Sequence, residues 1–377
     1  MRCIILGSHA KSLQNFRGPL IKRLLEQEHE VFALAPDYDS KSRLHIWNLG
    51  AKPIDCTLTR TKINPLLDVY HTLKLTWQIR QLRPDSILCY FIKPVIFGGI
   101  ASFLAKVPNR VVMLEGLGYM YTYNISDLGI LERILRKMVD FLYKFSLQFQ
   151  LHVIFLNQDD LDEFVGYGLV DHAKAVKLGG IGVDLDEWGS VANRPDPKVV
   201  TFTFVGRLLR EKGVMEFLEA ARVIKASYPE VRFILLGDVD ENPGSLSAVN
   251  IVNDVNAGVI EWPGHVEIKD WLKVTSVFVL PSYREGVPRS TQEAMAMGLP
   301  VITTDVPGCR DTVVEGVNGY VIPAKDPHAL AGAMQKFIDN PSTIKSMGVE
   351  SRRLATQHFD ECKINDRLIE ILIDKCN

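Results

Sequence analysis

The chain has 377 residues, of which 47% are hydrophobic and 23% are charged, and its formal net charge is -2. This composition excludes a disordered, collagen-like or disulfide-stapled chain, and the length fits two domains or one large one. The charge is unevenly distributed, because residues 1–150 carry 20 Lys and Arg against 12 Asp and Glu, whereas residues 151–377 carry 23 against 33. The near-neutral total argues against a nucleic-acid-binding protein, but the basic first half requires an explanation.

Short apolar runs alternate with helical patterns through the first half of the chain. Helices are predicted at Gly18–Glu26 and Asn64–Leu82. The predicted strands between them are uniformly apolar, which is typical of a parallel sheet covered by helices on both faces. These strands are Cys3–Leu6, Glu30–Ala35, Ser86–Phe91, Arg110–Leu114 and His152–Leu156.

The segment Ser86–Val107 is almost uncharged and has the length of a membrane-spanning helix. However, Lys93 and Pro94 fall near its middle, and proline interrupts the helical hydrogen-bond ladder. We therefore predict a buried strand, a turn, and a helix from about Val95 to Ala105.

The strand–helix pattern restarts after the polar, proline-containing stretch Asn193–Lys198. This predicts an α/β protein of two Rossmann-like domains, 1–182 and 183–377, with the C-terminal helix packing back onto the first domain. Ligands of such sheets bind beyond the carboxyl ends of the strands. The predicted strands are Thr201–Val205, Arg232–Leu236, Val277–Leu280, Pro300–Thr303 and Tyr320–Ile322, and the predicted helices are Val214–Ser227, Thr291–Met297 and Pro327–Asp339.

The strongest candidate site follows the predicted strand Val277–Leu280 and reads Pro281-Ser-Tyr-Arg-Glu-Gly-Val-Pro-Arg-Ser-Thr-Gln-Glu293. A strand–turn–helix transition presents unpaired backbone N–H groups and the positive end of a helix dipole, which suit an anionic ligand. Glu285 in the turn and Glu293 in the helix cannot attract a phosphate by their charge. They are better suited to accept hydrogen bonds from sugar hydroxyls. A structural alternative is that Ser290-x-x-Glu293 forms a capping box.

A second candidate loop lies between the strand Thr201–Val205 and the next predicted helix. Its Gly206 permits close backbone approach, and Arg207 and Lys212 can converge on one anion. Alternatively, this is an ordinary solvated basic loop.

Together these residues resemble the retaining nucleotide-sugar glycosyltransferases of the GT-B fold, specifically their fourth family, also called group one. The resemblance rests on the Gly-Arg…Lys-Gly loop at 206–213 and the Glu-x7-Glu element from Glu285 to Glu293. The segments Gly179-Gly-Ile-Gly-Val-Asp184 and Gly316-Val-Asn-Gly-Tyr320 also resemble family elements. The resemblance covers nearly the whole chain and implies two facing domains with a central cleft.

The resemblance implies a role for each of these residues. Arg207 and Lys212 would hold the donor diphosphate and stabilise its developing charge, Glu293 would bind the ribose hydroxyls, and Glu285 would contact the donor sugar. This is electrostatic catalysis, so neither a metal nor another cofactor is expected. The implied donor-binding residues are Gly206, Arg207, Lys212, Asp240, Glu241, Glu285, Gly286, Val287 and Glu293, and the implied catalytic residues are Arg207, Lys212, Glu285 and Glu115.

The sequence Asp238-Val-Asp240 allows a competing interpretation. An Asp-x-Asp after a strand could bind a metal in the other, single-domain glycosyltransferase fold. The stretch Gly237–Pro243 also resembles a loop near the nucleotide base in the group-one family, and we favour that interpretation.

The first half departs from many family members. Gly7 is the only glycine after the first strand, which disfavours a phosphate-cradling loop, and Glu115 stands where many relatives place a histidine. These features look most like transferases that extend polyprenyl-diphosphate-linked sugars. The resemblance then implies that His9, Arg17, Glu115 and Gly116 face the acceptor or the reacting sugar. The alternatives are a turn histidine, a solvated arginine and a helix-capping glutamate.

The segment Asp127–Gln150 places Arg133, Arg136, Lys137 and Lys144 among apolar residues at helical spacing. We expect the apolar side to pack on the core while the basic side faces an anionic membrane surface. The short apolar run at the start of the sequence is expected to be the first strand and not a signal peptide, which has a longer apolar region and a cleavage site, and the scattered cysteines suit a reducing compartment. The expected location is therefore cytoplasmic, at the inner face of the cytoplasmic membrane.

The resulting prediction is a retaining glycosyltransferase that moves a hexose or N-acetylhexosamine from a UDP-sugar to a polyprenyl-diphosphate-linked sugar in bacterial surface polysaccharide assembly. Two alternatives stay open at this point. One is a nucleotide-sugar epimerase or hydrolase on a similar scaffold, and the other is a non-catalytic nucleotide-sugar-binding protein.

Overall fold

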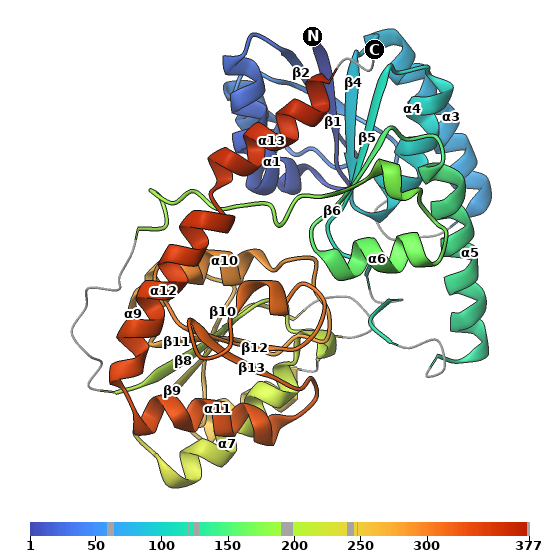
Figure 1. Cartoon of the computed structure of the whole chain (residues 1–377). Coiled ribbons are helices and arrows are strands. Elements are labelled where there is room, and N and C mark those ends of the chain that lie inside the picture. Colours follow the sequence, from blue (N-terminus) through green and yellow to red (C-terminus); the bar gives the residue numbers. More distant parts are fainter. Residues whose placement is uncertain are drawn as a thin grey trace. The chain divides into compact units, whose positions relative to one another are not determined.

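The computed structural model describes residues 1–58, 64–118, 121–123, 128–189, 199–239, 245–246 and 248–374 (Figure 1). The chain forms two compact units. Unit 1 comprises Met1–Ile181 and Cys362–Asn377, and unit 2 comprises Gly182–Glu361. The predicted linker Asn193–Lys198 lies outside the described residues.

Unit 1 is built on a seven-stranded sheet whose paired strands are all parallel. The order β3-β2-β1-β4-β5-β6-β7 reverses direction at β1, as in doubly wound folds. The predicted strands of this half are therefore confirmed, and their apolar side chains form the core. The strands are β1 (Arg2–Leu6), β2 (Glu30–Ala35), β3 (Lys52–Asp55), β4 (Ser86–Tyr90), β5 (Asn109–Leu114), β6 (His152–Phe155) and β7 (Ala175–Lys177).

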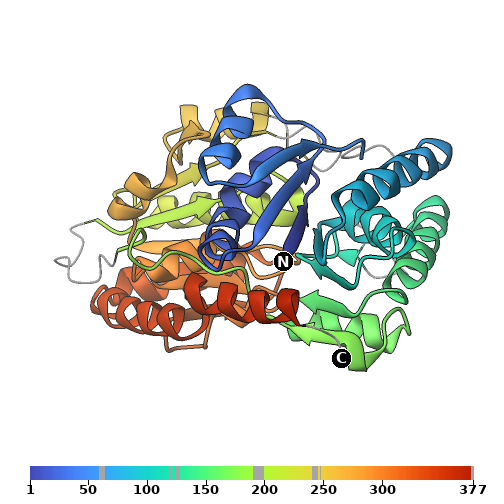
Figure 2. The ribbon, with the colours of Figure 1, turned by 90° about the horizontal axis from the view of Figure 1, so that it is seen from above.

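Helices cover the sheet of unit 1, and some helices that are far apart in sequence pack in the same layer. Helices α1 and α2 pack against each other, whereas α3 and α5 both pack on the segment around α4 (Figures 1 and 2). The bounds are α1 (Ala10–Glu26), α2 (Ser40–Asn48), α3 (Pro65–Leu82), α4 (Gly99–Leu104), α5 (Ile130–Leu147), α6 (Gln158–Gly166) and α13 (Glu361–Ile373).

Several elements of unit 1 differ from the prediction, which did not include α2, α6 or β7. Helix α1 begins at Ala10 and not at Gly18, with Pro19 inside it and with Nδ1 of His9 accepting a hydrogen bond from the backbone N–H of Ser12 (2.9 Å). Histidine is not among the usual N-cap residues, so the sequence carries no clear signal for this start. Strand β3 was not predicted, because it is a short, half-exposed edge strand that tolerates a proline.

The apolar segment after Ser86 folds as strand, turn and helix, as predicted. Strand β4 is followed by a π-helical turn at Pro94–Gly98 and then by α4. Within the part of the chain that the structure describes, no helix combines the length and the hydropathy that crossing a membrane requires.

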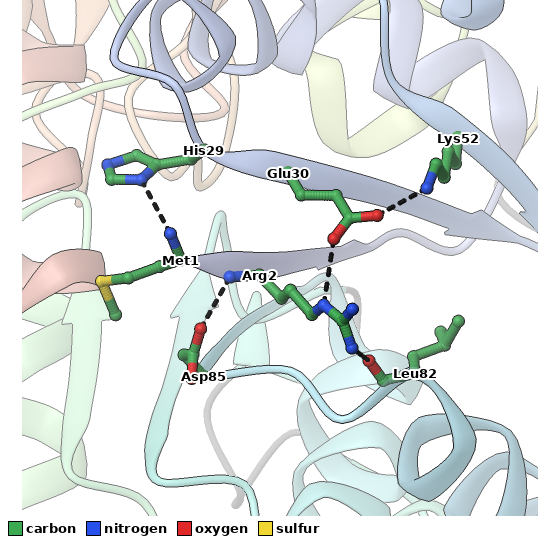
Figure 3. Close-up of polar contacts among 7 residues, drawn as sticks. All are labelled: Met1, Arg2, His29, Glu30, Lys52, Leu82 and Asp85. Atoms are coloured by element: carbon green, nitrogen blue, oxygen red, sulfur yellow. Dashed lines mark hydrogen bonds and ion pairs between the residues drawn. The ribbon is translucent and has the colours of Figure 1, made fainter.

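Polar contacts join the amino ends of the central strands of unit 1 (Figure 3). Nε of Arg2 donates to Glu30 (3.0 Å), and the backbone N–H of Arg2 donates to Asp85 (2.7 Å). These groups border a shallow polar hollow of about 380 Å³. The pairs are exposed to solvent, so they contribute little to stability. The candidate residues of unit 1 follow the opposite, carboxyl ends of the strands.

Unit 2 contains a second parallel sheet, of six strands in the order β10-β9-β8-β11-β12-β13. Two such sheets with helices confirm the predicted fold class. The strands are β8 (Thr201–Val205), β9 (Arg232–Leu236), β10 (Glu261–Gly264), β11 (Val277–Leu280), β12 (Val301–Thr304) and β13 (Gly319–Ile322). The helices are α7 (Val214–Ser227), α8 (Ala248–Asn256), α9 (Ile268–Val274), α10 (Arg289–Ala296), α11 (Pro327–Asp339) and α12 (Ser342–His358).

The chain leaves and re-enters unit 1 through two segments that bond to each other. The backbone N–H of Val183 donates to the carbonyl of Phe359 (2.9 Å), and the N–H of Glu361 donates to the carbonyl of Val183 (3.1 Å). Beyond this point α13 returns to unit 1. There it buries Leu368, Ile369 and Leu372, and the side-chain amide of Asn109 donates to the carbonyls of Ile371 and Leu372 (2.8 and 3.0 Å).

Candidate active site

The candidate donor residues of unit 2 lie on loops that follow neighbouring parallel strands. Residues 206–213 follow β8, residues 281–288 follow β11, and β8 pairs directly with β11. Gly213 has a left-handed backbone (φ 74°), and a Cβ there would overlap the carbonyl oxygen of Pro281. The two loops can therefore approach this closely only because residue 213 is glycine.

We expect Gly213→Ala to destabilise unit 2 through both strain and overlap. The left-handed backbone alone costs about 1–2 kcal/mol for an alanine. Gly258→Ala is the matched control, because Gly258 has a similar φ of 69° but open space around its Cβ position. Urea denaturation should show a clearly larger loss for residue 213; equal losses would mean that the close approach to Pro281 has no energetic weight.

Lys212 and Glu285 are brought together by these loops. The ammonium group of Lys212 forms an ion pair with Oε1 of Glu285, and the hydroxyl of Ser282 donates to the same oxygen (2.8 Å). Both charged side chains keep partial access to solvent, at 20% and 11% exposure. A bound anion can therefore reach the lysine, and the carboxylate holds the ammonium group in position.

The neighbouring donor candidates present backbone as well as side chains. The N–H of Gly206 bonds to the carbonyl of Leu236 (3.0 Å), while the side chain of Arg207 is exposed beyond the end of β8. Gly286 and Val287 are buried just before α10, whose N-cap residue is Pro288. The start of this eight-residue helix thus follows Glu285 of the Lys212–Glu285 pair by a few residues, in the segment where the sequence predicts an anion site.

The capping-box alternative for Ser290 and Glu293 is wrong. Ser290 lies inside the first turn of α10, and its hydroxyl donates to the carbonyl of Val205 (3.3 Å). Glu293 instead accepts a hydrogen bond from Nε of Arg289 (2.9 Å). The glutamate is therefore not committed to capping the helix.

Glu293 is a buried carboxyl group with 8% exposure. Burial raises its pKa to about 7, although the guanidinium of Arg289 opposes this shift. The group is therefore poised to change its protonation state near neutral pH, which is typical of functional sites.

The raised pKa of Glu293 predicts a pH-dependent stability. The folded state holds this proton more tightly than the unfolded state, whose pKa is near the ordinary 4.5. The resulting stabilisation is present below about pH 4.5 and is lost as the pH rises through about 7, a change of about 3 kcal/mol. The free energy of unfolding of wild type relative to Glu293→Gln should fall across this window. A difference in unfolding free energy that stays constant with pH would contradict the raised pKa of Glu293.

In unit 1, Arg17 and Glu115 form an ion pair that is almost completely buried, with exposures of 1% and 8%. The guanidinium also lies over the ring of Tyr90, 4.7 Å from its centroid. Arg17 comes from α1 and Glu115 follows β5, so residues far apart in sequence meet at one place. The solvated-arginine alternative is therefore wrong.

Further candidates surround this pair at the carboxyl ends of β1 and β4. The hydroxyls of Ser12 and Tyr90 are hydrogen-bonded (2.8 Å), and burial raises the pKa of Tyr90 to about 12. The ring of His9 lies 5.7 Å from that of Phe91, a non-glycine residue with φ of 69°. Such backbone strain is concentrated at functional sites. Gly116 follows Glu115 with φ of 133°.

Sequence reasoning missed several polar partners in these clusters. Arg289 could have been found from its i,i+4 spacing to Glu293. No spacing pattern in the sequence connects Ser282 to Glu285 or Tyr90 to Ser12. Asp240 and Glu241 lie outside the described residues, so the nucleotide-base prediction stays a prediction. Among the residues that the structure does describe, no group of His, Cys, Asp or Glu is arranged to hold a metal ion.

Comparisons with known proteins support the predicted class of enzyme and the fold. Residues 199–340 match the family model described as Glycosyl transferases group 1. The chain is 27% identical to the N,N'-diacetylbacillosaminyl-diphospho-undecaprenol alpha-1,3-N-acetylgalactosaminyltransferase of Campylobacter jejuni, with 98% of each chain covered. It is also 27% identical to the UDP-Gal:alpha-D-GlcNAc-diphosphoundecaprenol alpha-1,3-galactosyltransferase of Escherichia coli, over 84% of this chain and 82% of that one.

Solved structures share the fold over almost the entire chain. Anabaena HepE, in complex with UDP and glucose, has a TM-score of 0.77 at 18% identity and 99% coverage of both chains. The sucrose-phosphate synthase of Thermosynechococcus elongatus has the same TM-score at 18% identity and 98% coverage of both.

The chain has the GT-B fold, and its residues 199–340 match the group 1 glycosyltransferases. It is a transferase enzyme, and two relatives that it covers over most of their length are named for lipid-linked sugars. This supports the main functional prediction and not the epimerase, hydrolase or non-catalytic alternatives.

Proposed function

We propose that this enzyme transfers a sugar from a UDP-sugar to a polyprenyl-diphosphate-linked sugar, in the assembly of a bacterial surface polysaccharide or glycan precursor. The names of two near-full-length relatives supply the acceptor class, and one of them names a UDP-galactose donor. N-acetylgalactosamine and galactose are therefore the first donor sugars to test. The observation in this structure that carries the proposal is the Lys212–Glu285 pair.

We propose that the donor binds along the loops of unit 2. Arg207 and Lys212 bind the diphosphate, Glu293 accepts hydrogen bonds from the ribose hydroxyls, and Glu285 contacts the donor sugar. Gly206, Gly286 and Val287 contribute backbone groups. Diphosphate binding replaces the carboxylate of Glu285 as the partner of the lysine, which frees that carboxylate for the sugar.

The proposed reaction retains the anomeric configuration. Both relatives are named for alpha-1,3 linkages, and the sugar of UDP-galactose, the donor that one of them names, is itself alpha-linked to the diphosphate. The acceptor hydroxyl attacks the face that the leaving UDP departs from, and the leaving phosphate receives the proton. Arg207 and Lys212 stabilise the charge on UDP as it forms. Because these two cations supply the stabilising charge, the reaction requires no metal or other cofactor.

The Arg17–Glu115 cluster is the proposed acceptor side of the reaction. His9, Arg17, Glu115 and Gly116 would position the acceptor sugar or its diphosphate. Since this acceptor is lipid-linked, we propose that the enzyme works at the inner face of the cytoplasmic membrane, where UDP-sugars are available.

The test is a donor screen with a short-chain polyprenyl-diphosphate N-acetylhexosamine acceptor and mass measurement of the product. We expect the acceptor mass to rise by one hexose or N-acetylhexosamine, in the presence of EDTA as well as without it. Release of free sugar or an epimerised donor without acceptor would overturn the proposal. Loss of transfer in EDTA, restored by a divalent cation, would overturn the metal-independent part of it.

A further inference from the structure

Helices α3 and α5 leave large apolar side chains exposed on unit 1. The exposed fraction reaches 85% at Leu66 of α3 and 80% at Ile130 of α5. These side chains recur at helical spacing, so each helix carries a continuous exposed stripe. The set is Leu66, Leu67, Val69, Tyr70, Leu73 and Trp77 on α3, and Ile130, Leu131, Ile134, Met138, Phe141 and Phe145 on α5.

The expectation that the apolar side of residues 127–150 packs on the core holds only in part, because Tyr143 and Leu147 belong to the core whereas the stripe on α5 is exposed. Helix α5 also turns Arg136 inward, where its guanidinium lies 3.6 Å from the centroid of the Tyr121 ring and bonds to Glu163 (3.0 Å). Ser146, also buried, donates to the carbonyl of Val95 (2.8 Å). The stripe of apolar residues faces solvent because polar side chains occupy part of the inner face.

Helix α3 has the same inverted arrangement. Its buried face includes Asp68, Thr72 and Thr76 beside Leu75 and Ile79. Asp68 accepts a hydrogen bond from the ammonium group of Lys93 (3.0 Å), and the two threonine hydroxyls donate to backbone carbonyls of the helix. A water-facing helix normally shows the opposite distribution of side chains, so two such helices point to a non-aqueous neighbour.

The charges on the two helices are equally one-sided. The carboxylates present are Asp68, which pairs with Lys93, Glu132, which accepts from the N–H of Gly129 (2.8 Å), and Asp140, which accepts from the hydroxyl of Tyr121. None of the three is exposed. The exposed charges of α3 and α5 are all cations: Lys74, Arg80, Arg133, Lys137 and Lys144.

The two stripes belong to one layer of unit 1. Both helices pack on the π-helical turn at Pro94–Gly98 and on α4, and both views show them on the same side of the sheet (Figures 1 and 2). Phe103 and Leu104 of α4, the helix that both α3 and α5 contact, are also partly exposed, at 39% and 38%. Helix α4 thus adds exposed apolar side chains to the same layer.

We propose that this α3–α5 surface inserts its apolar side chains into the interfacial region of an anionic lipid bilayer. Apolar burial supplies the attraction, and the exposed cations select anionic lipid. The surface does not span the bilayer but lies on it. The inference deepens the proposed function and rests on it for the biological role, since a polyprenyl acceptor lies in a membrane; binding itself requires no transfer.

The test measures co-sedimentation of the full chain with vesicles of phosphatidylglycerol and phosphatidylcholine, without any substrate. Trp77→Ser/Phe141→Ser, with one change on each helix, should weaken vesicle binding at least tenfold. Replacing Lys137 and Lys144 by glutamine should weaken it about tenfold or more, and wild-type binding should fall in high salt. The matched control is Leu44→Ser/Trp47→Ser, which removes side chains of α2 with 58% and 64% exposure and should leave binding unchanged.

Insertion is read out directly by quenching of tryptophan fluorescence with lipids brominated on their acyl chains. Trp77→Phe should remove most of the quenching, and Trp47→Phe should not. Equal binding to neutral vesicles, or binding lost equally in the α2 control, would overturn the proposal. So would concentration-dependent dimers that the α3–α5 variants dissociate and that bind no vesicles.

Transfer to a short-chain, detergent-free acceptor separates this inference from the proposed function. The α3–α5 variants should keep that activity within about twofold while losing vesicle binding. Absence of transfer in the wild type with intact vesicle binding would reject the proposed function alone.

Discussion

Lys212→Ala is expected to lower kcat about 10²–10³-fold, because removal of one preorganised group that stabilises developing charge typically has this effect. The lysine contacts Glu285 directly and keeps partial solvent access, so its loss removes the charge that the leaving diphosphate meets. Rate measurements at saturating UDP-sugar, with thermal unfolding in parallel, provide the check.

Arg210→Ala is the control for this prediction. Arg210 is an exposed cation two residues away on the same loop. Its substitution therefore removes the same charge from the same region. Its kcat should stay within about threefold of wild type, as for ordinary surface substitutions. If Lys212→Ala retained activity close to wild type, or if both variants lost the same amount, the assigned role of Lys212 would be refuted.

Arg17→Met is expected to destabilise unit 1 by about 3–5 kcal/mol, because it leaves Glu115 as a buried charge without its partner. Arg17→Met/Glu115→Leu should recover most of this loss, since a buried ion pair is often replaceable by apolar groups. If the pair also acts on the acceptor, as we propose, the stable double variant remains unable to transfer sugar.

Hydrogen exchange of peptides from β4 and β5 reports unit 1 separately from unit 2. The control is Lys22→Met, which breaks the exposed Lys22–Glu26 pair of α1 and should change stability by less than about 1 kcal/mol. A stable double variant with wild-type transfer would reduce the Arg17–Glu115 pair to a structural role.

The loops of unit 2 could be predicted from sequence because their information is local. Each candidate follows a short apolar strand, and parallel topology then collects the loops at one edge of the sheet. The Arg17–Glu115 pair could be suspected only from resemblance, since no local pattern joins a residue of α1 to one after β5. Its burial under the ring of Tyr90 depends on tertiary packing.

The orientation of α5 shows a second limit of the sequence. Its periodicity correctly predicted an apolar stripe with basic neighbours, but periodicity does not say which solvent the stripe faces. The deciding residues are inward-facing Arg136 and Ser146, whose partners Glu163 and Val95 come from other elements. Similarly, Lys212 was expected to bind an anion, and its bond to Glu285 could be seen only once both loops were placed.

The return of the chain through α13 has a consequence for biosynthesis. The carbonyl groups that Asn109 binds, and the apolar side chains of α13 that unit 1 buries, are synthesised after all of unit 2. During synthesis on the ribosome, the part of the first sheet that α13 covers therefore stays exposed until the sheet of unit 2 has been synthesised. Unit 2, which is continuous in sequence, can close first, and the final helix then acts as the last step that commits the N-terminal half to its native state.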